Sequence, residues 1–191
     1  MMDIPAEVAR RIRLVLLDAD GVLTDGGLYV SEGVVGELEG RRFHVHDGLA
    51  IHMLRRAGLG IAIVSGKLSG SVKRRAEELG IEEVHQVTAF GKLEAVEGVL
   101  QRAGASWLEA AFLGDDLADL PVLREVGLPA AVANAVSEVK EAAAWIGKQT
   151  GGDGAVREFI EALLAARGEW TALVEEYVAE CVEHWRAETR D

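Results

Sequence analysis

The sequence has little cysteine, few basic residues and no long hydrophobic run. Cys181 is the single cysteine among 191 residues, which excludes an internal disulfide and a cysteine-based zinc site. Lys and Arg number 20 against 32 Asp and Glu, so the formal net charge is −12, and such a surplus repels nucleic acids and anionic lipids. No apolar run approaches the roughly 18 residues of a membrane span, and residues 1–13 lack the apolar core of a secretion signal. We therefore expect a cytoplasmic protein with no nucleic-acid or membrane partner.

The pattern of apolar residues along the sequence predicts one compact α/β domain. Short apolar runs alternate with longer stretches of helical periodicity from residue 14 onward, as in a parallel sheet with helices on both faces. Right-handed crossovers then give a Rossmann-like sandwich. Strands are predicted at residues 14–17, 61–64, 84–86, 110–113 and 130–133, with a short sixth at 145–146 as an option. Helices are predicted at residues 48–57, 68–79, 92–103, 117–126 and 136–143.

Two segments depart from this alternation. Residues 28–45 have β-prone ends around Gly33 and Gly36, which predicts a projecting β-hairpin. Residues 169–185 carry large apolar side chains at helical spacing, which predicts an amphipathic helix whose apolar face needs cover, from this chain or from a neighbouring subunit. We favour the neighbour. The predicted organisation is one domain at residues 1–166, which includes the hairpin, and a helical extension at residues 167–191.

Chemically active side chains follow four of the predicted strands. Ligands in open α/β sheets bind at the carboxyl ends of the strands, so these residues should meet in one site. The groups, in chain order, are Asp18 and Asp20, then Ser65, then Lys92, and finally Asp115, Asp116 and Asp119. Crowded carboxylates repel one another unless a cation neutralises them. Oxygen ligands without His or Cys favour Mg²⁺, which leaves coordination positions for a phosphate oxygen.

This constellation predicts phosphoryl transfer. Asp18 is the candidate nucleophile, and Asp20 is the candidate acid that protonates the leaving alcohol and then activates water. Ser65 and Lys92 are candidates to hold phosphate oxygens. For Asp116, capping the following helix or tethering Lys92 is the expected role. Either acidic cluster alone could be an ordinary turn, and it is the order of all the groups that favours a site.

The same residues resemble the motifs of the haloacid dehalogenase superfamily, and most closely those of the 3-deoxy-D-manno-octulosonate 8-phosphate (KDO 8-phosphate) phosphatase family. The similarity spans about residues 14–164 and includes Asp18-Ala-Asp20-Gly21-Val-Leu-Thr-Asp-Gly and Gly114-Asp115-Asp116-Leu-Ala-Asp119. The resemblance implies Mg²⁺ held by Asp18, the backbone carbonyl of Asp20 and Asp115, with Asp119 supporting these ligands. It also implies phosphate contacts from Ser65 and Lys92, and a role in lipopolysaccharide biosynthesis.

The spacing of the motifs leaves no room for a lid domain. Residues 21–64 are used by one hairpin and one helix, and residues 93–114 by a helix and a strand. A site open to water needs some other cover, and a second subunit is the economical one. The resemblance agrees, because it implies a homotetramer in which the hairpin and the tail of neighbouring chains border the active site.

The expected substrate is a small phosphorylated metabolite, and the resemblance implies a sugar acid held by a set of residues near the site. These candidates are His46, Asp47, Gly48, His52, Gly66, Lys67 and Arg75. His46, His52 and Lys67 stand where the family usually has Arg, whose planar two-pronged grip on an anion neither Lys nor His reproduces. The loop from Gln86 to Lys92 is longer than the usual form. The histidines could equally be half-exposed polar residues, and Arg75 a solvated charge.

Three other functions remain open at this point. The chain could be a non-catalytic oligomerisation domain like that of CMP-sialic acid synthetases, which the presence of both Asp18 and Asp20 disfavours. A phosphoacceptor signalling domain also uses an acidic cluster, a hydroxyl and a Lys, but its accepting Asp follows the third strand. The third alternative is a phosphatase for a different phosphorylated metabolite.

Overall fold

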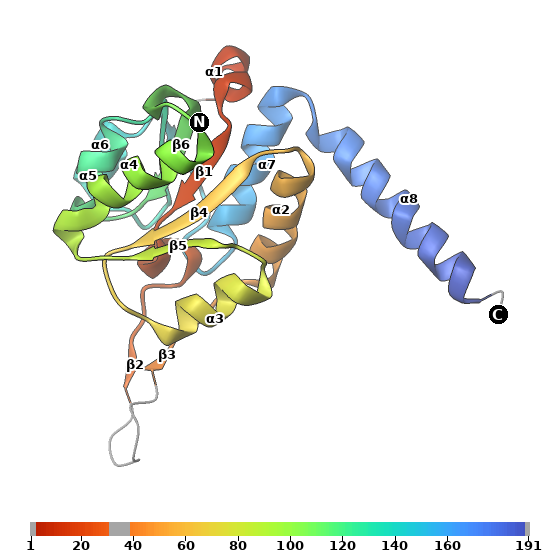
Figure 1. Ribbon diagram of the computed structural model, residues 1–191, viewed down its shortest axis with the longest axis horizontal. Coiled ribbons are helices and arrows are strands. Elements are labelled where there is room, and N and C mark those ends of the chain that lie inside the picture. Colours follow the sequence, from red (N-terminus) through yellow and green to blue (C-terminus); the bar gives the residue numbers. More distant parts are fainter. Residues whose placement is uncertain (1–2, 31–38, 190–191) are drawn as a thin grey trace.

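A six-stranded parallel sheet forms the centre of the computed structural model, which describes residues 3–30 and 39–189 (Figure 1). The strand order is β5-β4-β1-β6-β7-β8. The bounds are β1 Leu14–Leu17, β4 Gly60–Ser65, β5 Glu83–Gln86, β6 Ala110–Gly114, β7 Leu128–Ala131 and β8 Trp145–Ile146. A separate antiparallel pair, β2 Tyr29–Val30 and β3 Glu39–Gly40, belongs to the projecting hairpin.

The central strand β1 is apolar at every position, because it has a neighbour on each side and helices on both faces. All four residues of β1 are buried, and the strand pairs in register with β4 and with β6. Strands buried on both faces are expected to be continuously apolar. The core therefore surrounds β1, and whatever follows β1 lies at the middle of the sheet edge.

The helices form two packed groups. Contacts join α2 to α7 and α1 to α7 in one group, and α4 to α5 and α5 to α6 in the other. Figure 1 shows α3 below β5, near the base of the hairpin. The helix bounds are α1 Ala6–Arg11, α2 Val45–Arg56, α3 Gly70–Glu78, α4 Lys92–Ala103, α5 Leu120–Leu123, α6 Ser137–Ala142, α7 Ala155–Arg167 and α8 Trp170–Glu188.

The sheet and the order of its helices confirm the predicted fold class. The strand at 130–133 was placed wrongly, because β7 begins at Leu128 and includes Pro129, which pairs in register with Phe112. The helix expected at 117–126 is shorter, since a 3₁₀ turn, η4 (Leu117–Asp119), precedes α5.

The hairpin is also shorter than predicted. Its turn, with Gly33 and Gly36, falls outside the described residues. Phe43 makes only an isolated bridge to Thr24, and Val45 already belongs to the first turn of α2. The segment 43–45 therefore leads into a helix, not out of a strand.

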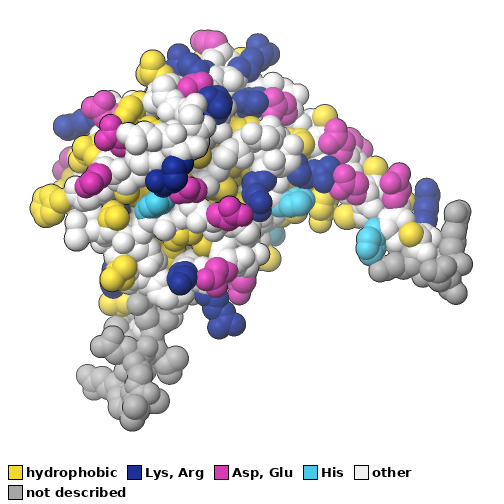
Figure 2. All heavy atoms as spheres, in the orientation of Figure 1, with side chains coloured by type: hydrophobic (Ala, Val, Ile, Leu, Met, Phe, Trp, Pro, Cys, Tyr) yellow, Lys and Arg dark blue, Asp and Glu magenta, His cyan; other side chains and the backbone are white. Residues whose placement is uncertain are grey.

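The C-terminal helix α8 runs away from the body of the molecule (Figure 1). Parts of α8 contact the rest of the chain: Leu173 is buried, and Arg56 forms a two-pronged ion pair with Glu180 at 2.6 and 2.7 Å. Three other apolar residues of the helix, Val178, Val182 and Trp185, are exposed, and Figure 2 shows the helix projecting from the globular part. Among the described residues, no helix combines the length and apolar character that crossing a membrane requires.

Candidate active site

Adjacent strands of the sheet bring the two halves of the acidic cluster together. Leu17 at the end of β1 is level with Leu113 in β6, and the backbone N–H of Asp18 donates to the carbonyl of Leu113 at 3.1 Å. Asp18 and Asp115 therefore leave the sheet side by side, although 96 residues separate them (115 − 18 − 1). Oxygen atoms of Asp18, Asp115 and Asp119 lie within 4.8 Å of one another, as the sequence predicts.

Lys92 joins this cluster from the start of α4. Its Nζ donates to Asp18 Oδ1 at 2.7 Å and to Asp119 Oδ1 at 2.6 Å. All three side chains are buried, and charge-assisted hydrogen bonds of this kind are the strong ones. Burial by itself lowers the pKa of Lys92, but the charges of Asp18 and Asp119 outweigh it and raise the pKa. Lys92 is thus held charged beside the candidate nucleophile.

Asp119 orients the loop that carries Asp115. Its Oδ2 accepts from the backbone N–H of Asp115 at 2.9 Å and of Asp116 at 3.3 Å. With Oδ1 on Lys92, both Asp119 oxygens have partners, which suits a supporting role. Asp116 accepts from the N–H of Leu117 at 2.7 Å, so it caps η4 as predicted, while the tether on Lys92 is Asp119.

Together with Asp119, the carboxylates of Asp18 and Asp115 carry more negative charge than the single ammonium of Lys92 neutralises. Burial, followed by the charge of Asp119, raises the pKa of Asp18 to about 7 despite Lys92. Burial, followed by the charges of Asp18, Asp119 and Asp116, raises the pKa of Asp115 to about 8. Asp115 Oδ1 is buried without a hydrogen-bond partner in the described part of the chain. An orphaned hard oxygen beside Asp18 fits a divalent cation such as Mg²⁺.

The loop after β1 depends on the close approach of backbone to carboxylate. Gly21, in η1 (Ala19–Leu23), has φ +88°, and a Cβ there would overlap the Asp115 carboxylate. Only glycine combines this backbone conformation with that space. Asn134 fixes the loop from outside: its Nδ2 donates to the Gly21 carbonyl at 3.0 Å, and its Oδ1 accepts from the Gly151 N–H at 2.7 Å. Sequence reasoning missed Asn134, because a lone Asn in a loop carries no pattern.

The candidate acid Asp20 has a partner that the sequence reasoning also missed. Arg41 Nε lies 2.8 Å from Asp20 Oδ1, and the Arg41 side chain is only 2% exposed. Arg41 also donates to the Gly27 carbonyl at 3.2 Å. A buried guanidinium one residue beyond β3 therefore fixes where the Asp20 carboxylate lies. The sequence does contain an Arg41-Arg42 pair at the base of the hairpin, but two adjacent arginines in a loop are usually interpreted as solvent-exposed charges.

Gly66, which directly follows Ser65 at the end of β4, lies against Lys92. Ser65 is buried, and its hydroxyl accepts from the Lys67 N–H at 3.3 Å. A Cβ added to Gly66 would lie 3.5 Å from Lys92 Cε, so this turn and Lys92 are in contact. The structure thus brings Asp18, Ser65, Lys92 and Asp115 to one edge of the sheet.

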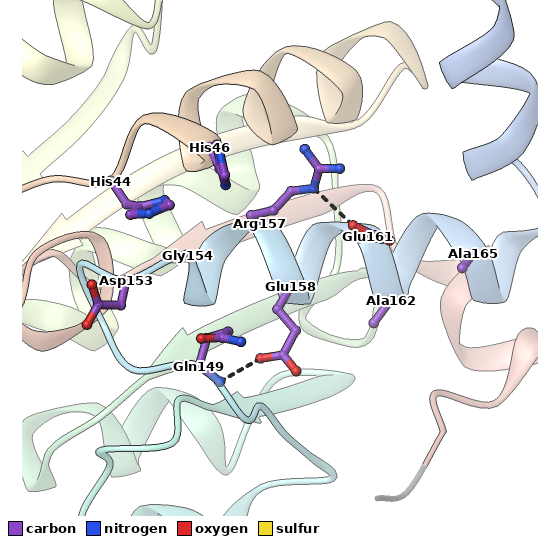
Figure 3. A pocket seen from close by; sticks show the side chains of 10 residues that line it. All are labelled: His44, His46, Gln149, Asp153, Gly154, Arg157, Glu158, Glu161, Ala162 and Ala165. Atoms are coloured by element: carbon purple, nitrogen blue, oxygen red, sulfur yellow. Dashed lines mark hydrogen bonds and ion pairs between the residues drawn. The ribbon is translucent and has the colours of Figure 1, made fainter.

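The predicted substrate contacts are more dispersed. Figure 3 shows His44 and His46 across from the start of α7, where they line a cavity of about 640 Å³ with residues such as Asp153 and Arg157. The two imidazole rings meet edge to face, with centroids 4.7 Å apart. His52 faces Tyr177 of α8, with ring centroids 6.2 Å apart. Among the described residues no hydrogen bond or ion pair joins these histidines to the acidic cluster.

Other residues of this predicted set make contacts within the chain. Asp47 is buried and accepts from the backbone N–H of Arg157 in the first turn of α7 at 2.9 Å. Arg75 pairs with Glu78 at 3.2 Å, and a Cβ on Gly48 would lie 3.1 Å from the Arg75 guanidinium. Lys67 is exposed. Their roles toward a substrate stay predictions.

Comparisons with known proteins identify the same family that the sequence motifs resemble. A model of the haloacid dehalogenase-like hydrolase family matches residues 83–160. The 3-deoxy-D-manno-octulosonate 8-phosphate phosphatase of Escherichia coli is 38% identical over 161 residues, 84% of each chain. The structure of the phosphatase of that name from Moraxella catarrhalis, in complex with magnesium, phosphate and KDO, superposes with a TM-score of 0.84 at 35% identity, covering 90% of this chain and 97% of the other. A probable YrbI family phosphatase from Pseudomonas syringae gives 0.85 at 43% identity, covering 91% and 96%.

Proposed function

The chain belongs to the KDO 8-phosphate phosphatase family of haloacid dehalogenase-like hydrolases, and we propose that it hydrolyses a small sugar-acid phosphate through a phosphorylated Asp18. The observation that carries this proposal is the buried bridge from Lys92 Nζ to Asp18 at 2.7 Å and to Asp119 at 2.6 Å, with Asp115 beside it. A fixed ammonium beside a carboxylate nucleophile stabilises the negative charge of an incoming phosphate.

The proposed reaction proceeds in two displacements. Asp18 attacks phosphorus, the bond from phosphorus to the alcohol oxygen breaks, and Asp20 gives its proton to that oxygen. Water then attacks the aspartyl-phosphate, Asp20 takes a proton from the water, and inorganic phosphate leaves as Asp18 is restored. Arg41 keeps the Asp20 carboxylate in place, while Ser65 and Lys92 hold phosphate oxygens.

Mg²⁺ is the proposed cofactor, held by Asp18, Asp115 and the backbone carbonyl of Asp20. When bound, it neutralises the clustered carboxylates and polarises a phosphate oxygen. The orphaned Oδ1 of Asp115 and the raised pKa values of Asp18 and Asp115 support a cation at this point. Asp119 supports the site from Lys92 and from the backbone of the Asp115 loop.

KDO 8-phosphate or a related ulosonate phosphate is the proposed substrate, and another phosphorylated metabolite is the alternative. The absence of arginine at positions 46, 52 and 67 motivates that alternative, since three strong anion contacts are missing. The remaining candidates for substrate contact are His46, Asp47, Gly48, His52, Gly66, Lys67 and Arg75.

We also propose a cytoplasmic homotetramer of chains, each with a main domain at 1–166 and an extension at 167–191. The exposed Val178, Val182 and Trp185 of α8 support contact with a neighbouring chain, because burying large apolar side chains is favourable.

A phosphatase panel tests the proposal. Purified protein is assayed for phosphate release from KDO 8-phosphate, other sugar phosphates and p-nitrophenyl phosphate, with Mg²⁺ and with EDTA. We expect magnesium-dependent release, greatest with an ulosonate phosphate. Release from another ester well above KDO 8-phosphate supports the alternative substrate, and no release from any ester contradicts the phosphatase function.

A further inference from the structure

The C-terminal helix α8 carries a row of apolar side chains along its outer side. We call this row the α8 seam: Val174, Val178, Cys181 and Trp185. Val178 and Trp185 are 51% and 62% exposed, and Val182 beside them is 38% exposed, while Cys181 is exposed as well. Burying large apolar side chains is favourable, so the α8 seam indicates a surface that another apolar surface covers.

The α8 seam lies on a different face of the helix from the one that packs on α2. Leu173 is buried, the Tyr177 ring faces His52, and Glu180 pairs with Arg56. At 3.6 residues per turn, this packed row and the α8 seam are roughly 100° apart around the helix axis. Packing on α2 therefore fixes the direction of α8 and leaves the α8 seam free to meet another chain.

The spacing of the α8 seam is that of a helix that pairs with another helix. Its members are four, three and four residues apart, which is the alternation that gives paired helices their repeat of 3.5 residues. A helix that leaves the body of the molecule, as α8 does in Figure 1, gains little from packing within its own chain. Since packing supplies most of the stability of helices in proteins, a second helix along the α8 seam explains why α8 is helical over its whole length.

The charges beside the α8 seam fit a second copy of α8 that runs antiparallel to the first. Glu175 and Arg186 are both exposed and lie on the same flank of the seam, 11 residues apart (186 − 175). In an antiparallel pair centred between Val178 and Cys181, Glu175 of each helix lies within side-chain reach of Arg186 of the other. A parallel pair instead puts like charges side by side, and flanking charges of this kind set the orientation of paired helices. Three more acidic residues of α8 lie on the side away from the seam, at positions 176, 180 and 183.

We propose that α8 is a self-association helix, and that two copies of this chain pair antiparallel along the α8 seam with Glu175 of each copy facing Arg186 of the other. The inference goes beyond the proposed phosphatase function and does not depend on it. It assigns a residue-level geometry to one contact of the proposed assembly. Because the pair has two-fold symmetry, every substitution along the seam acts at two places.

The single cysteine makes this pairing measurable. Cys181 is the only cysteine of the chain, so a short bismaleimide joins two chains only from residue 181 to residue 181. The rate of covalent dimer formation is followed on denaturing gels for the full chain. Val178→Gln should lower this rate by more than about tenfold, because it places an amide in an apolar seam at two points. Ala179→Gln is the matched control: Ala179 is the next residue, is exposed and lies off the seam, so this variant should react at the wild-type rate.

A charge exchange tests the antiparallel direction. Glu175→Arg and Arg186→Glu should each lower the rate about threefold, because each sets like charges opposite one another at two symmetric points. The double variant restores two opposite-charge pairs and should react at the wild-type rate. In a parallel pair the two positions do not meet, so the double variant stays slow.

Three results overturn the proposal. The first is a wild type that reacts no faster than Val178→Gln, and the second is a double charge variant that stays as slow as its parents. The third is equal reaction of wild type and Val178→Gln together with a several-fold lower kcat/KM for phosphate release in Val178→Gln, which places α8 over the active site of a neighbouring chain. Crosslinking needs no turnover, so a failure of the phosphatase function leaves this test intact.

Discussion

Replacing Asp115 with Asn should stabilise the metal-free protein, because the wild-type site holds more negative charge than it can neutralise. Asp115 has an orphaned Oδ1 and a pKa raised from 3.8 to about 8 by burial and then by the charges of Asp18, Asp119 and Asp116. A carboxylate whose pKa is higher in the folded than in the unfolded chain binds more protons when folded. The free energy of unfolding must therefore fall as pH rises from about 4 to about 8.

The structure sets the size of this effect. A shift from 3.8 to about 8 corresponds to about 6 kcal/mol at alkaline pH if the site stays rigid. The carboxylate is partly accessible, so water and side-chain movement relieve much of the charge. We expect a net stabilisation of about 2 kcal/mol from Asp115→Asn above pH 8, or about 4–8 °C in Tm for a chain of this length.

The assay is thermal unfolding in EDTA from pH 5 to pH 9. The wild type should lose stability across this window, and Asp115→Asn should lose less. Asp116→Asn is the control: it removes the same formal charge from an exposed neighbour and keeps a side chain able to cap η4. Because the charge of Asp116 is a smaller cause of the raised Asp115 pKa than burial, Asp18 and Asp119, its pH dependence should stay much closer to wild type than that of Asp115→Asn. Mg²⁺ should raise the Tm of the wild type more than that of Asp115→Asn. If both variants shift Tm equally, or neither does, the account of charge crowding is wrong.

Three further predictions concern the reaction and the assembly. Asp18→Asn should reduce phosphate release to below a few per cent of wild type with circular dichroism unchanged, because an amide does not attack phosphorus; greater residual activity excludes Asp18 as nucleophile. Asp20→Asn should lower kcat roughly 10²–10⁴-fold on a sugar phosphate and less on p-nitrophenyl phosphate, whose leaving group needs little protonation, and equal losses point to a structural role. Light scattering should give a tetramer for the full chain and a smaller species for a chain ending at Arg167, whereas a full-length monomer refutes the assembly.

The sequence predicts those parts of the fold that local pattern determines. The bounds of α4 at Lys92–Ala103 match the prediction, because its periodicity is uninterrupted and Gly104 adopts the left-handed conformation that ends it. The start of α2 was missed because Val45 has a strand-forming side chain. What favours a helix there is tertiary: Asp47 lies in the first turn of α2 and accepts from the backbone of Arg157, 110 residues later.

The same distinction applies to the candidate site. Asp18, Lys92, Asp115 and Asp119 could be predicted because strand ends in a parallel sheet share one edge. Arg41 and Asn134 could not, because their roles follow from how the hairpin and the loop after β7 fold over Gly21 and Asp20. Neither position has a spacing or composition that separates it from ordinary loop residues.

The Arg41–Asp20 ion pair affects which segments a designer must transfer to reproduce this site in another protein. A designer who grafts residues 14–26 onto another parallel sheet transfers the nucleophile and the candidate acid together, since both lie on that one peptide. The graft leaves behind the guanidinium that reaches Asp20 from beyond β3, as well as the amide of Asn134 that holds Gly21. Besides the Lys92 and Asp115–Asp119 segments that complete the acidic cluster, a working transplant therefore has to include the hairpin and the loop after β7.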